Sequence, residues 1–248
     1  MRILVSNDDG VHAAGLAALA EALASLGRVV VVAPDRERSA VGRSLTLHRP
    51  LRLERLREGW YAVDGTPIDC VHLGIHGILE EPPDLLVAGI NHGGNLGDDI
   101  GYSGTAGVAF EGALFGVPSF AVSLVARSAF HFAPAARVAR RVAEAVVRHG
   151  LPQATFLNVN VPNVASAAEL RGVRMTRQGR RVFGSGVAEK VDPRGRTYYW
   201  IGARELGYVE EDVGTDVDAI AHGCVSVTPV RTDLTDLAFL EELRRWQL

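Results

Sequence analysis

Lysine is almost missing from this sequence, since Lys190 is the only lysine among 248 residues. A phosphate-binding loop of the Gly-x-x-x-x-Gly-Lys-Ser/Thr type is therefore excluded, and a Schiff-base lysine is not expected. Cysteine is also scarce, because Cys70 and Cys224 are the only two and lie far apart. They form neither a metal-binding pattern nor a disulfide framework, which favours a reducing compartment.

Long apolar runs and a strong excess of charge are missing as well. No segment is apolar enough to span a bilayer, and no signal-like segment follows Met1, so the expected location is the cytoplasm. The net charge of −3 and the pI of about 6.2 predict neither a membrane partner nor a stable nucleic-acid complex. The length and the hydrophobic content of 47% suffice for one large domain.

Short apolar segments alternate with helical segments along most of the chain. The expected strands cover residues 3–6, 29–33, 85–90, 119–124 and 157–161, with a β-excursion over 51–63. The expected helices cover residues 13–26, 66–79, 104–115 and 133–149. This alternation predicts an α/β fold that is Rossmann-like, with three layers and a mostly parallel sheet covered by helices on both faces.

The pattern changes after Pro162. Further strands are expected over residues 173–178, 181–187, 197–203 and 225–230. The last of these returns to the main sheet, and the others form an extended β-hairpin arm. A terminal helix over 234–248, capped near Thr232 or Asp233, closes the chain. We expect a single domain, with a core of about 1–165 plus 223–232 and oligomerisation elements of about 173–205 and 233–248.

The segment Asn7-Asp8-Asp9-Gly10 directly follows the first apolar strand. Ligands of open α/β sheets bind just beyond the carboxyl ends of such strands. Two adjacent carboxylates repel each other there unless a cation neutralises them. The pair therefore indicates a hard divalent metal on Asp8 and Asp9. The alternative is a polar turn with a helix cap, which Asx residues often provide.

Three further polar segments follow expected strands or open an expected helix. They are the loop 35–44 with Ser39, the segment 91–95 with Asn91, and Ser103-Gly104-Thr105. Because the strands are parallel, all three are expected beside the acidic pair. Two carboxylates with neutral oxygens from Ser39 and Asn91 suit a magnesium-like cation.

The step Ser103-Gly104-Thr105 supplies hydroxyls, a glycine that permits close approach, and the free N–H groups of a helix N-terminus. Such a terminus is typical of an anion site. An ordinary Ser/Thr helix cap is the alternative here. For the Asn- and Gly-rich segment 91–95 the alternative is an ordinary turn.

Several other polar residues are candidates with a structural alternative. His92 and His12 could assist proton transfer or be structural. His72 and His76 share a helix face, but no third ligand is evident and we interpret them as structural. Arg180-Arg181 could contact phosphate or a partner subunit, or form a solvated face.

Several motifs occur in a characteristic order. They are Asn7-Asp8-Asp9-Gly10, the Ser39 loop, Gly89-Ile90-Asn91-x-Gly-x-Asn95, Tyr102-Ser103-Gly104-Thr105, Asn158-Val159-Asn160-Val161-Pro162-Asn163 and Gly214-Thr215-Asp216-Val217-Asp218-Ala219. Together they resemble the SurE family, the stationary-phase survival proteins, over essentially the whole chain.

This resemblance implies a metal-dependent 5′-nucleotidase that acts on nucleoside monophosphates, as a homodimer or homotetramer. It implies one Mg²⁺ or Mn²⁺ per subunit on Asp8, Asp9, Ser39 and Asn91. It also implies phosphate contacts from Asn95, Ser103, Gly104 and Thr105. The expected reaction is attack by a metal-activated water, with Asp8 and Asp9 as catalytic residues and Asp9 as the candidate for proton transfer. Base preference and cleavage of 3′-nucleotides or polyphosphate stay open.

Two other classes of function are weaker. A receiver-like signalling module needs an acceptor aspartate where Asn91 stands and a lysine nearby, yet Lys190 lies on the arm. A nucleotide-binding protein without turnover is disfavoured by the complete set of metal ligands.

Overall fold

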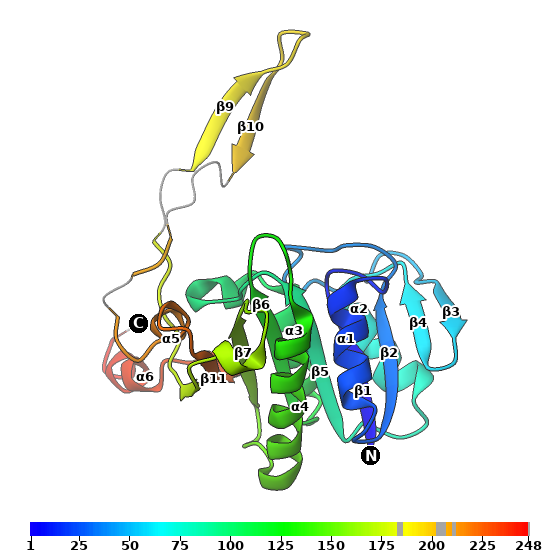
Figure 1. Cartoon of the computed structure of the whole chain (residues 1–248). Helices are drawn as coiled ribbons and strands as arrows, with labels where there is room; N and C mark the ends of the chain where they lie inside the picture. Colours follow the sequence, from blue (N-terminus) through cyan, green and yellow to red (C-terminus); the bar gives the residue numbers. More distant parts are fainter. Residues whose placement is uncertain (183–185, 202–206, 210–211, 248) are drawn as a thin grey trace.

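The computed structural model describes residues 1–182, 186–201, 207–209 and 212–247 (Figure 1). The strands of its main sheet are β1 (Arg2–Ser6), β2 (Arg28–Pro34), β3 (Leu53–Arg57), β4 (Trp60–Val63), β5 (Leu85–His92), β6 (Ser119–Val125), β7 (Thr155–Pro162), β8 (Val173–Met175) and β11 (Val225–Arg231). Their order in the sheet is β3-β4-β2-β1-β5-β6-β7-β11-β8. The run from β4 to β7 is parallel, whereas β3 and β11 are antiparallel to β4 and β7. The predicted α/β fold with a mostly parallel sheet is confirmed.

Helices cover both faces of this sheet. The helices of the described chain are α1 (Ala14–Leu23), α2 (Pro67–Leu73), α3 (Gly104–Leu114), α4 (Phe132–His149), α5 (Asp216–Ala221) and α6 (Leu237–Leu243), with short helices η1 (Gly74–Ile78), η2 (Gly97–Gly101) and η3 (Ala167–Glu169). Helices α1 and α4 pack together on one face, and α2 and α3 on the other. This gives the expected three layers.

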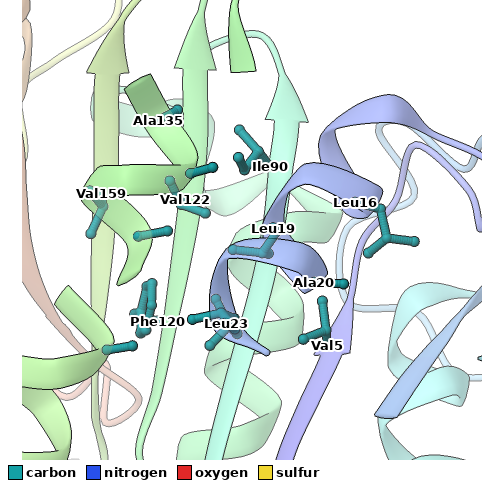
Figure 2. Close-up of a cluster of buried hydrophobic side chains, with 14 of the residues drawn as sticks. Val5, Leu16, Leu19, Ala20, Leu23, Ile90, Phe120, Val122, Ala135 and Val159 are labelled. Carbon is teal, nitrogen blue, oxygen red and sulfur yellow. The ribbon is translucent and has the colours of Figure 1, made fainter. Parts of the chain in front are cut away.

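Alternate residues of the central strands enter two separate cores. Ile3 and Val5 point towards α1 and α4, whereas Leu4 points towards α2 and α3. Figure 2 shows the first core, where side chains of α1 such as Leu19 lie near Ile90 of β5. Because both faces are buried, the strands contain continuous apolar runs. Their carboxyl ends are thereby fixed along one edge of the sheet.

The N-terminus of α2 is formed by a capping box. The Thr66 hydroxyl accepts from the Asp69 amide at 3.1 Å, and the Asp69 carboxylate accepts from the Thr66 amide at 2.8 Å. Pro67 occupies the first turn, where its missing N–H is harmless. The expected helix over 66–79 continues past Leu73 as the π-helical turn η1.

Two C-terminal elements differ from the prediction. The expected strand over 173–178 is the shorter β8, which pairs with β11 at the edge of the main sheet instead of joining the arm. The terminal helix α6 begins only at Leu237, because Asp236 caps it by accepting from the Phe239 amide at 2.9 Å. Thr232 and Asp233 therefore do not cap it. The helix also ends at Leu243, earlier than the expected end at 248, and Leu248 lies outside the described residues.

The arm is an antiparallel hairpin of β9 (Val187–Val191) and β10 (Thr197–Ile201), which extends away from the sheet (Figure 1). The strand expected over 181–187 is wrong for the described residues, because β9 begins only at Val187 and continues to Val191. Residues 183–185 of the expected range lie outside the described residues, as do 202 and 203 of the strand expected over 197–203. In the described ranges, no helix combines the length and apolar character needed to cross a membrane.

Helix α1 approaches β5 so closely that its second residue must be glycine. A Cβ on Gly15 would lie 2.1 Å from the carbonyl oxygen of Ile90. This oxygen belongs to the backbone of β5, so moving it would distort the strand. We expect Gly15→Ala to lower the free energy of unfolding by about 1–3 kcal/mol through overpacking. Urea denaturation measures this, with Gly101→Ala as control because its Cβ meets nothing within 4 Å. Equal losses in both variants would contradict the expectation.

Candidate metal and phosphate site

The turn after β1 is held by Asn7, which leaves both aspartates available. The Asn7 amide donates to the Gly10 carbonyl at 3.0 Å, and its Oδ1 accepts from the Gly10 amide at 3.2 Å. Gly10 has φ of 99°, a conformation that favours glycine. Helix α1 has Ala13 at its N-cap and no side-chain cap. The polar turn of the alternative interpretation is therefore present and is held by Asn7, whereas no Asx side chain caps α1.

Asp8 is enclosed by the N-terminus of α3. It is only 5% exposed, and its Oδ1 accepts a hydrogen bond from the Thr105 hydroxyl. A Cβ on Gly104 would lie 2.8 Å from both Cβ and Oδ2 of Asp8, so only glycine permits this approach. The helix N-terminus and the first strand thus meet at this carboxylate.

Asp9 lies beside the end of β5. Its Oδ2 accepts from the His92 backbone amide at 3.2 Å, and its Oδ1 lies 3.6 Å from His92 Nδ1. The Asp9 side chain is 10% exposed. The two carboxylates therefore contact different elements, α3 for Asp8 and β5 for Asp9, and neither forms an ion pair with an arginine in the described part of the chain.

Burial is the main electrostatic influence on the pair. Desolvation raises the pKa of Asp8, although the Thr105 hydroxyl and the backbone amides of Thr105 and Gly104 oppose it. Desolvation, followed by repulsion from Asp8 and from Glu37, raises the pKa of Asp9 to about 7. Both shifts have the same first cause: a negative charge on either carboxylate is poorly solvated at this buried edge.

Asn91 brings a neutral oxygen to the same place. Its Nδ2 donates to the Gly93 carbonyl at 2.9 Å, which turns its Oδ1 towards the Thr105 hydroxyl at 3.1 Å. The Thr105 hydroxyl therefore contacts oxygens of both Asn91 and Asp8, yet its single proton can serve only one of them. One inward-facing oxygen is left without a proton donor, which suits a cation.

The loop that carries Ser39 is tied to the acidic pair through the backbone. The Arg38 amide donates to the Asp8 carbonyl at 2.7 Å. The Ser39 side chain is exposed, and its hydroxyl donates to Glu37 Oε1 at 2.7 Å. The structure therefore brings Asp8, Asp9 and Asn91 together and places Ser39 on the adjoining loop.

Asn95 is fixed by a buried polar network on β6 and β7. Its backbone amide donates to Asn160 Oδ1 at 2.9 Å, and its carbonyl accepts from Asn158 and Asn160 at 2.8 and 3.1 Å. Its own Nδ2 donates to the Ser123 hydroxyl at 2.8 Å. Asn95 is only 8% exposed. These contacts anchor the loop, and a phosphate contact from Asn95 stays a prediction.

Ser103 caps α3, because its hydroxyl accepts from the Ala106 amide at 3.0 Å. The alternative of an ordinary cap thus describes what Ser103 does in the structure. The amides of Gly104 and Thr105 face Asp8, so this helix N-terminus adjoins the acidic pair as expected. Phosphate binding by Ser103, Gly104 and Thr105 stays a prediction.

The donor set fits a hard divalent cation. Carboxylate and amide oxygens converge near Thr105, and such ligands suit Mg²⁺ or Mn²⁺. No cluster of three or more His, Cys, Asp or Glu side chains placed to hold a metal occurs among the described residues. Neutral oxygens such as that of Asn91 are therefore needed beside the two carboxylates.

The remaining candidates have structural contacts. The His92 ring packs on Phe130 and Phe132 at 4.9 and 5.0 Å between centroids, and His12 is exposed. His72 Nε2 forms a hydrogen bond with Glu111 Oε1 at 2.9 Å. The rings of His72 and His76 both pack edge-on against the ring of Phe115. Arg180 is exposed near Asp212, whereas Arg181 pairs with Asp99 at 2.5 Å.

Sequence reasoning missed some residues that shape the site. Glu37, which adds a third carboxylate near Asp9, was missed. Asp216 was named only within a motif, and it accepts from the Gly97 and Gly179 amides at 2.9 and 2.8 Å. Asn158 and Asn160 were noticed only as a motif. Their spacing of two residues on an apolar strand was the available signal, because it places both on one sheet face.

Comparisons with known proteins show the family of this chain. The family model "Survival protein SurE" matches residues 3–185. This chain belongs to the SurE family. Two SurE relatives carry the name "5′-nucleotidase SurE". The one from Syntrophotalea carbinolica is 57% identical over 100% of this chain and 98% of its own length, and the one from Geobacter sulfurreducens is 55% identical over 100% and 94%. The crystal structure of the SurE protein from Aquifex aeolicus has 47% identity, a TM-score of 0.88 and 98% coverage of both chains.

The pKa of Asp9 predicts how pH affects the metal-free protein. The pKa of Asp9 is about 7 in the folded protein and 3.8 ordinarily, so the folded protein binds a proton more tightly than the unfolded chain does. Protonated Asp9 therefore makes its full contribution to the free energy of unfolding below about pH 3.8, and this contribution is lost as the pH rises through about 7. Asp9→Asn cannot ionise and keeps the acceptor for the His92 amide. We expect this variant, treated with EDTA, to melt about 2 °C or more above wild type at pH 8, corresponding to roughly 1 kcal/mol.

The difference in melting temperature between Asp9→Asn and wild type should be smaller at pH 5, where Asp9 of the folded wild type is protonated. Melting curves at both pH values, with Asp233→Asn as a control at an exposed carboxylate, measure it. Identical pH slopes for wild type and Asp9→Asn would refute this account of the acidic pair.

Proposed function

We propose that this chain hydrolyses nucleoside 5′-monophosphates to a nucleoside and inorganic phosphate, with one divalent metal ion per subunit. The observation that carries the proposal is the pair of buried carboxylates, Asp8 and Asp9, which lie beside the N-terminus of α3 and pair with no arginine among the described residues. The name of the relatives that are 55–57% identical over the whole chain supports the activity.

Asp8, Asp9, Ser39 and Asn91 are the proposed metal ligands. A bound Mg²⁺ or Mn²⁺ would supply Lewis-acid stabilisation for the charge that develops on the phosphoryl group and would lower the pKa of the attacking water. Thr105 orients the oxygens of Asp8 and Asn91, and the His92 amide orients Asp9. The carboxylates thus serve as ligands, which disfavours a covalent aspartyl intermediate.

The phosphate is proposed to lie at the N-terminus of α3. There the backbone N–H groups and the hydroxyls of Ser103 and Thr105 offer donors to its oxygens, with Asn95 on the adjoining loop. Water attacks phosphorus, and the bond to the 5′-oxygen breaks. Asp9 is our candidate for the proton transfer that this requires, because Asp8 is enclosed by α3.

The first test is phosphate release from AMP, GMP, CMP and UMP with Mg²⁺, with Mn²⁺ and with EDTA. We expect metal-dependent release, and a loss of at least about a hundredfold in Asp8→Asn. The fold should survive, because asparagine removes a desolvated charge and keeps an acceptor for Thr105.

Metal binding measured by calorimetry gives a second readout for the same site. Asp8→Asn should weaken it, and Asp233→Asn, at an exposed carboxylate, should change neither binding nor turnover. Near-normal turnover in Asp8→Asn, or release that EDTA does not affect, would overturn the assignment.

The hairpin is proposed to join copies of the chain into a dimer or tetramer. Its side chains Val187, Val191, Tyr199, Trp200 and Ile201 are between 59% and 88% exposed. An isolated two-stranded hairpin is marginally stable in water, and this one extends away from the sheet (Figure 1). A second copy that covers these side chains would stabilise it. The proposal includes the expected division of the chain into a core of about 1–165 plus 223–232 and oligomerisation elements of about 173–205 and 233–248.

Light scattering after size exclusion tests the assembly. Wild type should have two or four times the mass of one chain, 26.6 kDa. The double variant Tyr199→Asp with Ile201→Asp should have a lower mass, whereas Val147→Asp, on the exposed side of α4, should not. A wild-type mass of one chain, or an unchanged mass in the double variant, contradicts the proposal.

A further inference from the structure

Asp216, the first residue of α5, is completely buried and holds two distant segments of the chain. Its Oδ2 accepts from the Gly97 amide at 2.9 Å, and its Oδ1 accepts from the Gly179 amide at 2.8 Å. Gly97 belongs to the site loop, residues 93–103, which connects β5 to α3. Gly179 belongs to the arm base, residues 176–182, which precedes the hairpin. One carboxylate therefore joins the site loop to the arm base.

The two segments also touch through their backbones beside this carboxylate. Gly97 has φ of 53°, and a Cβ on it would lie 3.0 Å from the carbonyl carbon of Gly179. A Cβ on Gly179 would lie 2.9 Å from Asp216 Oδ1. Glycine at both positions is what lets the two amides reach the same side chain. The junction is thus a close contact between backbones and does not depend on flexible side chains.

A carboxylate can serve both segments at once, and a neutral amide cannot. Each carboxylate oxygen accepts, whereas asparagine has one accepting oxygen and one donating nitrogen. Desolvation raises the pKa of Asp216, and the amides of Gly97, Gly179 and Val217 oppose this shift. A neutral side chain could hold either segment alone at a lower cost of burial. The choice of a buried carboxylate therefore indicates that both segments must be held together.

The site loop carries groups that are proposed to bind phosphate. Asn95 lies near its start, and Ser103, the cap of α3, lies at its end. The Asp99 carbonyl accepts from the Ser103 amide at 3.1 Å. The Asp98 carboxylate accepts from the Arg181 amide of the arm base at 2.8 Å, which gives the loop a second connection to that segment. The middle of the loop is therefore tied to the arm base, and its ends hold the proposed phosphate donors.

We propose that Asp216 is a positioning residue for phosphate release, because it holds the site loop against the arm base and thereby sets the place of Ser103 and the N-terminus of α3. The inference rests on the proposed function and adds a residue outside the proposed metal and phosphate ligands. Asn158 and Asn160 anchor Asn95 independently, so losing the bond to Gly97 would displace the later part of the loop. A displacement of about 1 Å in a reacting group can slow catalysis about a hundredfold.

Asp216→Asn is the informative variant, because it keeps the size of the side chain but leaves one of the two segments without its acceptor. Asp218→Asn is the matched control on the same helix. Asp218 is also buried, and its carboxylate accepts from the Gly214 amide at 3.0 Å and lies near Arg174 and His222 at 3.3 and 3.0 Å. None of these three partners belongs to the site loop.

Hydrogen exchange followed by mass spectrometry tests the connection itself. In Asp216→Asn, peptides that cover residues 93–103 or 176–182 should exchange about tenfold or more faster than in wild type, since an amide has lost its charged acceptor. In Asp218→Asn the peptides of the site loop should exchange at the wild-type rate. Unchanged exchange of both segments in Asp216→Asn overturns the inference.

Kinetics in the full-length, metal-saturated enzyme test the consequence for function. In Asp216→Asn, kcat for phosphate release from AMP should fall about tenfold to hundredfold, and in Asp218→Asn it should not. The Kd of Mg²⁺ measured by calorimetry should stay close to that of wild type, because Asp8, Asp9 and Asn91 lie outside the site loop. A merely structural role would lower the melting temperature and leave kcat of the folded enzyme unchanged, and that result overturns the inference.

A second variant keeps the test decisive if Asp216→Asn does not fold. Gly179→Ala lies on the arm base, and its Cβ would press against Asp216 Oδ1 from outside the site loop. It should lower kcat for AMP in the same direction and again leave the Kd of Mg²⁺ unchanged. Wild-type kcat in folded Gly179→Ala, together with unchanged exchange of residues 93–103, overturns the inference.

Failure of the proposed function is distinguishable from failure of this inference. If wild type releases no phosphate from any nucleotide, the function fails, and binding of inorganic phosphate to the metal-loaded protein, measured by calorimetry, decides about Asp216. Weaker binding in Asp216→Asn than in Asp218→Asn supports its role in positioning the phosphate donors. Equal binding in the two variants, or no binding to wild type, overturns it.

Discussion

The burial of two neighbouring carboxylates governs the arrangement at the carboxyl edge of this sheet. Asp8 and Asp9 stand where water screens them poorly, and the pKa of both is raised. The surroundings offer hydrogen-bond donors, namely the Thr105 hydroxyl and the amides of α3 and β5, but no arginine in the described chain pairs with either. These hydrogen bonds reduce the free-energy cost of burying two carboxylates, but they do not remove it, because both pKa values stay raised. A bound cation would lower this cost further.

Close backbone approach makes this concentration of charge possible. Glycine stands at position 10, where the chain turns with positive φ, and at position 104, where α3 contacts Asp8. Gly15 does the same for α1 against β5. Each contact brings an element nearer than a side chain would allow. The candidate site therefore depends on glycine positions, which carry no side chain, as much as on the two aspartates.

Local patterns predicted the central architecture well. Buried parallel strands contain continuous apolar runs, and the capping box at Thr66 and Asp69 is visible as residue types at fixed spacing. The juxtaposition of Asp8, Asp9 and Asn91 followed from parallel strands that end at one edge.

Distant pairings were not predictable in the same way. The edge position of β8 depends on its register with β11, where Val173 faces Val225. Four acidic or hydroxyl residues precede α6, namely Thr232, Asp233, Thr235 and Asp236, and only Asp236 caps it. The burial of Asn95, assigned to phosphate from the family resemblance, is set by Asn158 and Asn160 on β7, which no local pattern links to it.

The anchoring of Asn95 by Asn160 has a consequence for biosynthesis. The two residues are separated by 65 positions, and β6 with α4 lies between them. A nascent chain that has left the ribosome only as far as α4 already contains every proposed metal ligand, yet lacks the strand that fixes their loop. Closing so long a segment is entropically costly and happens after local structure has formed. Productive geometry is therefore acquired late in folding, when β7 joins the sheet, and partly made chains carry the acidic pair without its support.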